Sequence, residues 1–302
     1  MKTIIFGGSG SFGTAMTKRL KDVVIFSRNE KMQFEHKQKS KAGEYIIGDI
    51  RDYEAVYKAL EGIDNVIIAS AMKHIDKCEA NPDECRKTNI DGCINVINAS
   101  IERGIKKIVF LSTDKATNPS TIYGCSKLFV EMYCECVDNK NTDIIRTRYG
   151  NVFGSNGSVV WIFDKLSREG KKLTVTNPEM TRFFMSIEEA VDLVEYALEN
   201  GKNGDLFVLK NKSCTIKELA DLFSNNQEVI GNRCEEKTDE ALLTINELNH
   251  SELKGNIYRI NKEIKGETHE LPFTSDIAER LTKEELESLL EEWRNGIISS
   301  QL

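Results

Sequence analysis

The sequence predicts an α/β fold in which a doubly wound parallel sheet is followed by a smaller second domain. Three observations lead to this prediction. Short β-branched runs alternate with longer amphipathic segments through the first half of the chain. The runs are continuously apolar, as strands covered by helices on both faces should be. A glycine-rich loop over residues 7–13 joins the first apolar run to the first amphipathic segment.

Six strands are expected in the first half of the chain. They cover residues 3–6, 23–26, 45–47, 65–69, 108–112 and 144–148. Helices are expected between them at residues 12–21, 53–60, 82–103 and 122–137, with Asn81 as an N-cap. These lengths suit the crossovers between neighbouring parallel strands. We therefore assign residues 1–150 to one domain.

After Tyr149 the pattern changes to glycine-punctuated loops, which predicts a second domain over residues 151–302. A strand at 173–176, a helix at 187–199 and a strand at 206–209 are expected, and parts of residues 180–212 should return to the first domain. A helix at 216–223 and a final acidic helix at 283–293 follow. No flexible linker separates the two parts, so we expect a broad interface between them.

Length, composition and charge exclude several classes of protein. With 302 residues, 40% of them hydrophobic and 29% charged, the chain has enough apolar surface for a sizeable core. A net charge of −7 with scattered lysines and arginines argues against a nucleic-acid partner. The longest apolar runs are strand-sized, so we expect no membrane span. The first strand begins too close to Met1 for a signal peptide, which predicts a cytoplasmic protein.

Eight cysteines raise the alternatives of disulfide bonds or a zinc site. No Cys-x-x-Cys pair occurs anywhere in the sequence. Cys134 and Cys136 come closest, but residues two apart on a helix do not face each other. We therefore expect reduced thiols and no metal site.

The 7–13 loop has the Gly-x-x-Gly-x-x-Gly spacing that lets backbone amides approach a pyrophosphate at the start of a helix. An acidic residue after the second strand would select NAD through the ribose 2′-hydroxyl, but Ser27, Arg28 and Asn29 stand there. Arg28 can fork onto a 2′-phosphate, so we expect NADP. An exposed loop arginine is the alternative. Asp49 and Ile50, past the third strand, are placed for a contact with the adenine edge.

Tyr123 and Lys127 are four residues apart on a predicted helix and therefore share one face. Ser112 and Thr113 end the preceding strand. A lysine ammonium near a tyrosine lowers the pKa of the phenol and lets it exchange protons near neutral pH, while a neighbouring hydroxyl orients the substrate. After a dinucleotide loop, this layout predicts proton transfer coupled to redox chemistry.

With these features the chain resembles the extended short-chain dehydrogenase/reductase superfamily, which carries Gly-x-x-Gly-x-x-Gly and Tyr-x-x-x-Lys on a Rossmann-like fold. Within it, the chain is similar to the C5-inverting 4,6-dehydratases that act on UDP-N-acetylglucosamine in polysaccharide and pseudaminic-acid biosynthesis. The resemblance runs from residue 1 to about residue 223. The motifs that carry it are Ser112-Thr113-Asp114-Lys115-Ala116, Asn118-Pro119, Tyr123-Gly124-Cys125-Ser126-Lys127, Arg148-Tyr149-Gly150-Asn151-Val152, Met180-Thr181-Arg182-Phe183, Ala71-Met72-Lys73-His74 and Lys87-Thr88-Asn89.

The resemblance implies catalytic roles for Thr113, Asp114, Lys115, Tyr123 and Lys127. Sugar 4-epimerases of the superfamily need only the tyrosine and lysine pair, whereas water elimination also needs a base for the C5 proton and an acid for the C6 hydroxyl. In the resembled family Lys115 would be the C5 base and Asp114 would assist at C6. A strand-end ion pair without a catalytic role is the alternative.

Further residues are expected at the ligands. The expected NADP contacts are Gly7, Gly10, Ser11, Phe12, Gly13, Ser27, Arg28, Asn29, Asp49, Ile50, Ala69, Ala71, Lys73, Asn89, Ser112, Tyr123, Lys127 and Tyr149. The expected contacts to the sugar nucleotide are Lys73, Asn151, Val152, Asn156, Gly157, Ser158, Val159, Arg182 and Glu267.

Three departures from the family pattern concern the substrate. Asn156 stands where the family usually has arginine, and Trp161 where proline is usual. Residues 265–270, Lys-Gly-Glu-Thr-His-Glu, resemble a shortened form of the family's Arg-Pro-Gly-Glu-Lys-x-His-Glu. The substrate-binding arginine of that motif has no aligned counterpart, which leaves Arg259 or Lys265 as replacements.

We therefore predict an NADP-dependent 4,6-dehydratase of a UDP-N-acetylhexosamine that inverts C5 and gives a 6-deoxy-4-keto-L-arabino sugar. The resemblance also implies a homo-oligomer, either a dimer or a hexamer. Tyr123 favours inversion, because membrane-anchored retaining relatives carry methionine at this position. A retaining dehydratase, a UDP-sugar 4-epimerase and an NADP-binding regulatory protein are the alternatives.

Overall fold

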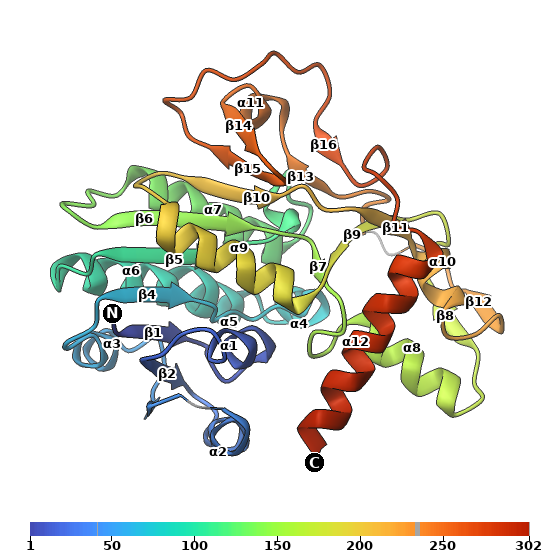
Figure 1. Cartoon of the computed structure of the whole chain (residues 1–302), viewed down its shortest axis with the longest axis horizontal. Helices are drawn as coiled ribbons and strands as arrows, with labels where there is room; N and C mark the ends of the chain where they lie inside the picture. Colours follow the sequence, from blue (N-terminus) through green and yellow to red (C-terminus); the bar gives the residue numbers. More distant parts are fainter. Residues whose placement is uncertain (41, 233–235, 302) are drawn as a thin grey trace.

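The computed structural model describes residues 1–40, 42–232 and 236–301, and a nine-stranded sheet lies at its centre (Figure 1). The strand order is β14-β15-β10-β6-β5-β4-β1-β2-β3, and all neighbours from β3 to β10 pair in parallel. These strands are β1 (Thr3–Phe6), β2 (Val23–Ser27), β3 (Glu44–Ile47), β4 (Asn65–Ile68), β5 (Lys107–Leu111), β6 (Asp143–Arg148) and β10 (Leu206–Leu209). The predicted doubly wound parallel sheet is confirmed.

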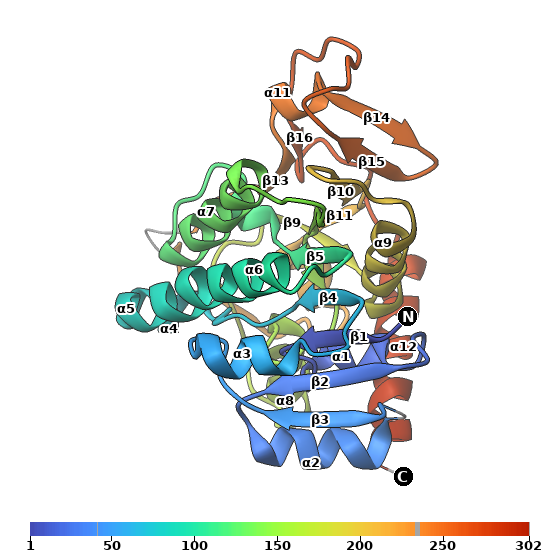
Figure 2. The same cartoon turned by 90° about the vertical axis from the view of Figure 1, so that its left-hand side faces the viewer.

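Helices cover both faces of this sheet, as Figure 2 shows. Ile4 and Phe6 of β1 pack with α6 on one face, and Ile5 between them packs with α9 on the other. Alternate residues of one strand are thus buried in two separate cores, which explains why the strands are apolar without alternation. The helices on the first face are α3 (Tyr53–Ala59), α6 (Gly92–Glu102) and α7 (Ile122–Cys136), and those on the second are α1 (Ser11–Met16) and α9 (Ile187–Asn200).

The helix expected at residues 82–103 is present, but a π-helical turn interrupts its α-helical hydrogen bonding. Two short helices, α4 (Ile75–Ala80) and α5 (Pro82–Arg86), are followed by a π-helical turn over Lys87–Asp91 and then by α6. Asn89 in this turn accepts a hydrogen bond from the Met72 amide at 2.7 Å and donates one to the Met72 carbonyl at 2.9 Å. The irregular turn therefore fixes the loop that follows β4, which is a common use of π-turns at functional sites.

Beyond residue 150 the chain builds three small sheets and then returns twice to the large one. The small sheets pair β11 (Ser213–Thr215) with β9 (Thr181–Met185) and β7 (Asn151–Val152), β12 (Gln227–Val229) with β8 (Leu173–Val175), and β13 (Ala241–Leu243) with β16 (Phe273–Thr274). The returns are β10, as expected, and the hairpin of β14 (Ser251–Lys254) and β15 (Ile257–Ile260), which was not expected. The domain boundary at residue 150 stays a prediction.

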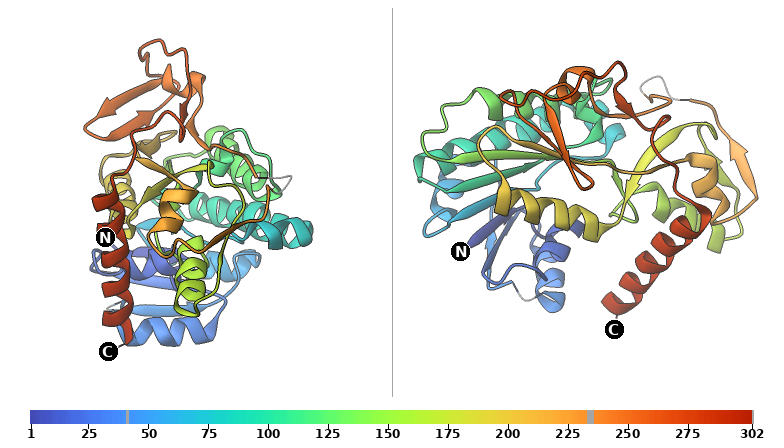
Figure 3. Two further views of the ribbon diagram at one scale, coloured as in Figure 1. Left: turned by 90° about the vertical axis from the view of Figure 1, so that its right-hand side faces the viewer. Right: turned by 45° about the horizontal axis from the view of Figure 1, so that its top comes forward.

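Four helices accompany the small sheets, namely α8 (Val159–Arg168), α10 (Ile216–Asp221), α11 (Ile245–Leu248) and α12 (Lys283–Gln301). Figure 3 shows α12 extending alongside α8 at the edge of the molecule. Leu286 and Leu290 of α12 pack with Phe163 of α8 and Leu219 of α10 in a separate core. The last helix is therefore a packed element as well as an acidic one. No helix within the described ranges is long and apolar enough to cross a membrane.

Candidate active site

A cleft of about 1450 Å³ opens at the carboxyl ends of β1, β4 and β5 and is closed on its other side by segments from beyond residue 150. Ligands of open α/β sheets bind at this edge, because the loops that follow the strands converge there. Most of the residues expected at the ligands line this cleft. The expected residues that do not line it are Gly13, Asp49, Asn89, Asp114 and Glu267.

The glycine loop forms one end of the cleft. A side chain at Gly13 would place its Cβ 2.0 Å from the Gly8 carbonyl oxygen, so only glycine lets α1 cross the loop this closely. Gly7, Gly10, Ser11 and Phe12 face the cleft, and a Cβ at Gly10 would meet no described atom closer than 3.5 Å. Gly13 therefore shapes the loop from behind, while the space in front of Gly10 suits a pyrophosphate.

Arg28 stands half-exposed beside the loop, with its Nη1 atom 3.5 Å from the Asp49 carboxylate. Asp49 is bound more closely by Arg51, whose Nη2 lies 2.7 Å away. Burial alone would raise the pKa of Asp49, but its bonds and charge interactions with Arg51 and the charge of Arg28 hold that pKa below its usual value. Asp49 thus binds two arginines. Of the two residues expected at the adenine, Asp49 and Ile50, only Ile50 faces the cleft. The sequence analysis missed Arg51.

Tyr123 and Lys127 both face the cleft from the start of α7. The Thr121 hydroxyl caps this helix by accepting a hydrogen bond from the Gly124 amide at 3.0 Å. A Cβ at Gly124 would lie 2.3 Å from the Lys115 carbonyl oxygen, so glycine allows the helix to pack directly on the Asp114–Ala116 turn. The turn that carries Lys115 and the helix that carries Tyr123 are therefore held in fixed contact.

The pKa of Tyr123 is not lowered as the sequence analysis expected. Burial raises the pKa of Tyr123 to about 12, and the main opposing charge is that of Lys115 rather than Lys127. Lys127 is itself buried, and its Nζ atom donates to the Leu111 carbonyl at 2.8 Å. Burial lowers the pKa of Lys127. Lys127 is thus anchored to the end of β5.

Lys115 lies between two carboxylates at the centre of the cleft. Its Nζ atom is 3.1 Å from Asp114 Oδ1 and 3.3 Å from Glu240 Oε1. Burial alone would lower the pKa of Lys115, but these carboxylates outweigh it and raise that pKa. Asp114 is fully buried behind Lys115, and burial raises its pKa. Its Oδ2 atom has no hydrogen-bond partner among the described residues. Asp114 is thus not among the residues that line the cleft and is connected to it through Lys115.

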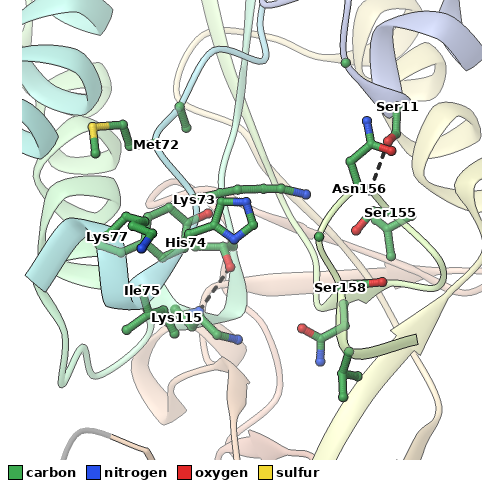
Figure 4. Close-up of a pocket in the computed structure, with 18 of the residues that line it drawn as sticks. Ser11, Met72, Lys73, His74, Ile75, Lys77, Lys115, Ser155, Asn156 and Ser158 are labelled. Atoms are coloured by element: carbon green, nitrogen blue, oxygen red, sulfur yellow. Dashed lines mark hydrogen bonds between the residues drawn. The ribbon is translucent and has the colours of Figure 1, made fainter. Parts of the chain in front are cut away.

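The opposite wall carries residues from the loop after β7. The amide of Asn156 donates to the Ser11 hydroxyl at 3.2 Å and so links this wall to the glycine loop (Figure 4). The close-up shows Lys73 reaching from the β4 side toward this wall, with His74 beside it. Burial lowers the pKa of Lys73, which has no ion-pair partner within the described ranges. The cleft-facing residues of β7, of this loop and of the start of α8 are Asn151, Val152, Ser155, Asn156, Gly157, Ser158 and Val159.

Arg182 lines the cleft, but its guanidinium is directed at backbone carbonyls. Nη1 donates to the carbonyls of Thr181 at 2.7 Å and Thr238 at 2.9 Å, and Nη2 donates to the Lys237 carbonyl at 2.8 Å. These bonds hold the segment of residues 236–240 against the cleft. Arg182, which was expected to contact the sugar nucleotide, therefore binds backbone carbonyls of the chain in this structure.

The expected C-terminal motif at residues 265–270 is wrongly placed. Glu267 is exposed and does not line the cleft, and Arg259 pairs with Asp205 and Glu252 in the β14–β15 hairpin instead. Glu236, Lys237 and Glu240 line the cleft, and the sequence analysis missed all three. Residues 233–240, Arg-Cys-Glu-Glu-Lys-Thr-Asp-Glu, match Arg-Pro-Gly-Glu-Lys-x-His-Glu at four positions without a gap. Arg233, at the arginine position, lies outside the described residues.

Comparisons with known proteins place the chain among enzymes that act on nucleotide sugars. A family model described as polysaccharide biosynthesis protein matches residues 3–262. The chain is 42% identical to a UDP-N-acetylglucosamine 4,6-dehydratase (inverting) of Campylobacter jejuni, over 87% of this chain and 83% of that protein. It is also 37% identical to a UDP-glucose 4-epimerase of Rickettsia canadensis, over 95% of this chain and 94% of that protein.

Solved structures give the same picture of the fold. The structure of Pen from Bacillus thuringiensis superposes with a TM-score of 0.89 at 34% identity and covers 97% of this chain and 98% of its own. DesIV, a dTDP-glucose 4,6-dehydratase from Streptomyces venezuelae solved with NAD and TYD bound, superposes with a TM-score of 0.72 at 17% identity. It covers 79% of this chain and 87% of its own, and at this identity the likeness concerns the fold alone.

Proposed function

The chain belongs to the polysaccharide biosynthesis protein family within the extended short-chain dehydrogenase/reductase superfamily, and from this premise we propose that it is a UDP-N-acetylglucosamine 4,6-dehydratase. The relatives with substantial identity carry the names of nucleotide-sugar dehydratases and epimerases, so the chain is an enzyme. The names of the relatives leave two reactions to choose between. Both begin with oxidation of C4, and only dehydration then removes water across C5 and C6.

The observation that carries the proposal is the position of Lys115 in the cleft. It lies between Asp114 and Glu240 and packs through its turn against the helix of Tyr123. Epimerisation at C4 needs a proton acceptor for one hydroxyl, which Tyr123 supplies alone. A buried lysine with two carboxylates beside it can take and give further protons. Elimination needs these further proton transfers, whereas epimerisation does not.

The residues support the following sequence of proton transfers. Tyr123 takes the proton of the C4 hydroxyl. A nicotinamide dinucleotide held along the glycine loop and the ends of β4 and β5 would supply the hydride acceptor for C4 and the hydride donor for C6. Lys115 passes a proton to Asp114, whose pKa is raised by burial, and the resulting amine removes the C5 proton. The protonated Asp114 then supplies, through Lys115, the proton with which the C6 hydroxyl leaves as water. Lys115 finally reprotonates C5.

For the cofactor we propose NADP. The space in front of Gly10 and the unpartnered buried hydroxyl of Ser112, within the described residues, fit a dinucleotide along the strand ends. Arg28 lines the cleft near the expected ribose position, and no carboxylate other than Asp49 pairs with it in the described ranges. Asp49 is itself paired more closely with Arg51. A guanidinium in this position favours a 2′-phosphate over a bare hydroxyl.

We also propose inversion at C5, a cytoplasmic location and assembly into a homo-oligomer. Inversion rests on Tyr123 and on the name of the Campylobacter jejuni relatives. It requires C5 to be reprotonated from the face opposite the original hydrogen, so Lys115 and the sugar must move relative to each other before Lys115 returns a proton. The product is then the L-arabino 4-ketose.

Incubation of the purified enzyme and NADP with UDP-N-acetylglucosamine in deuterated water tests this function. The expected product has lost one molecule of water by mass spectrometry, carries deuterium at C5 and shows the L-arabino ring couplings in its proton NMR spectrum. A product of unchanged mass with inverted C4 establishes the epimerase, which the long match to the Rickettsia relatives makes the second candidate. A D-xylo product establishes retention, and binding of NADP without turnover establishes a regulatory protein.

A further inference from the structure

We propose that Glu240 is a positioning residue for Lys115 and that it makes water elimination, but not C4 oxidation, depend on the segment of residues 236–240. The proposal rests on the proposed dehydratase function and gives a role to the last residue of the segment that matches the family motif, a role that the names of the relatives do not assign. Glu240 is far from Lys115 in the sequence, and only the packing of residues beyond 150 on the strand ends brings the two together.

The contacts of Glu240 are those of a side chain held in one place. It is 4% exposed, and its Oε1 atom lies 3.3 Å from Lys115 Nζ. The other oxygen, Oε2, lies 3.4 Å from Lys237 Nζ, which in turn donates to the Thr117 carbonyl at 3.0 Å. Each carboxylate oxygen thus faces a different lysine, so rotation of the carboxylate away from Lys115 would also break its bond to Lys237.

The backbone of this segment is anchored independently of the carboxylate. The Glu240 amide donates to the Ser275 hydroxyl at 2.9 Å, and the Ser275 amide donates to the Glu240 carbonyl at 2.8 Å. Arg182 donates to the carbonyls of Lys237 and Thr238. Because these bonds use main-chain atoms, a change of the Glu240 side chain leaves them in place.

Lys115 is the group on which Glu240 acts. Asp114 holds the ammonium from the β5 side at 3.1 Å, and Glu240 holds it from the opposite element. The other charged or titratable groups that act on Lys115 are Tyr123, from α7, and Arg182, from β9. With Glu240 removed, Lys115 loses one of two anions and its restraint on one side. Its reach to the substrate and its affinity for a proton then change together.

The oxidation pair has no direct contact of this kind. Tyr123 and Lys127 share α7, and Lys127 Nζ is held by the Leu111 carbonyl. No hydrogen bond joins either side chain to residues 236–240 in the described ranges. A substitution at Glu240 should therefore slow water elimination and leave C4 oxidation in place.

The test compares Glu240→Gln with wild type, using NADP-loaded enzyme and UDP-N-acetylglucosamine in deuterated water. Reduced nicotinamide, measured by its absorbance in a single turnover, reports C4 oxidation, and deuterium at C5 reports proton removal. We expect C5 exchange to fall on the order of tenfold or more, while C4 oxidation changes by less than about twofold. Asp239→Asn is the matched control, because it removes the neighbouring charge yet keeps the oxygen that accepts from Thr181.

Two further readouts separate positioning from a structural role. Loss of an anion beside Lys115 lowers the pKa of Lys115, so the acidic limb of the elimination rate should move to lower pH in Glu240→Gln. Glu240→Asp keeps the charge and should recover part of the rate and the wild-type position of the limb. Equal loss of oxidation and elimination, an unshifted limb, or wild-type exchange in Glu240→Gln would overturn the proposal. A wild-type enzyme that neither exchanges C5 nor loses water defeats the proposed function instead.

Discussion

Tyr123 and Lys127 lie one turn apart on a single helix, whereas Lys115 and Glu240 meet from distant parts of the chain. The first pair depends on α7 and the end of β5, which belong to one contiguous unit. The second depends on how residues 236–240 pack over that unit. A catalytic pair set by helical spacing survives distant changes, but a pair made by tertiary contact is only as stable as the junction between the two regions.

Arg148 makes several of the contacts between these two regions, and its removal should have the largest effect on the stability of the fold. It is 2% exposed, pairs with Glu131 of α7 and Glu247 of α11, and donates to the Leu242 carbonyl at 2.8 Å. Arg148→Ala leaves the buried Glu131 without its cation, and we expect a loss of about 3–5 kcal/mol in the free energy of unfolding. Urea denaturation followed by circular dichroism measures this loss.

Arg19→Ala is the control for the junction. Arg19 has three carboxylate partners, but its side chain is 39% exposed and lies on the surface between α1 and α9. Exposed pairs of this kind contribute little to stability because water screens them. If the two variants unfold at the same urea concentration, Arg148 is not the residue that holds the two regions together.

Lys115→Ala should separate elimination from C4 oxidation. The variant keeps Tyr123 and Lys127, so C4 oxidation should persist, while C5 exchange and product release fall on the order of 10³-fold. Tyr123→Phe should lose oxidation and therefore both steps. Single-turnover absorbance and deuterium incorporation measure the two halves separately. Dehydration by Lys115→Ala near the wild-type rate would return Asp114 and Lys115 to the role of a structural ion pair.

The sequence was sufficient for the parts of the fold that repeat a simple pattern. Continuous apolar runs predicted each parallel strand of the nine-stranded sheet to within a residue or two, because burial on both faces leaves no polar alternation. Helix α2 (Glu30–Lys39) was missed because the side chains it buries are polar. Gln33 donates to the carbonyls of Ser27 and Ile46, and His36 pairs with Tyr45 at 2.8 Å. Such a helix has no apolar stripe to detect.

The candidate site divides in the same way. Spacing alone predicted that Tyr123 and Lys127 share a helix face, and the strand-end rule predicted that the Asp114 turn lies beside them. The residue pattern of a single sequence does not show which carboxylate from beyond residue 150 packs on Lys115. The resemblance to the family offered one signal, the ungapped match of residues 233–240 to the family motif, but the partial match at residues 265–270 obscured it.

Arg28 lies at the far end of the cleft and belongs to neither catalytic pair, so its loss should change binding and leave the two reaction halves in their normal ratio. We expect Arg28→Ala to weaken NADP by about 1.5–3 kcal/mol, as loss of a charge-assisted contact should, and to weaken NAD much less. Isothermal titration calorimetry with both cofactors measures the difference. Equal losses for NADP and NAD contradict the assignment of Arg28 to the 2′-phosphate.

The smallest effect concerns the pH dependence of the junction through Glu247. Burial alone would raise the pKa of Glu247, but the Arg148 guanidinium 2.8 Å away outweighs it and holds that pKa below 4.5. The folded state thus binds the proton less readily than the unfolded chain does. The stabilisation by Glu247 is therefore complete above its ordinary pKa and is lost as the pH falls through the lower folded value.

Glu247→Gln keeps an oxygen for the Thr244 cap and removes only the charge, so it isolates this contribution. We expect it to be less stable than wild type by about 1 kcal/mol at neutral pH, since Glu131 still pairs with Arg148. The difference should shrink as the pH is lowered through the acid range, because wild-type Glu247 then becomes neutral as well. Urea titrations of both proteins across that range measure it. A difference that stays constant down to the acid transition would mean that the charge of Glu247 adds nothing to the junction and that Glu131 alone compensates Arg148.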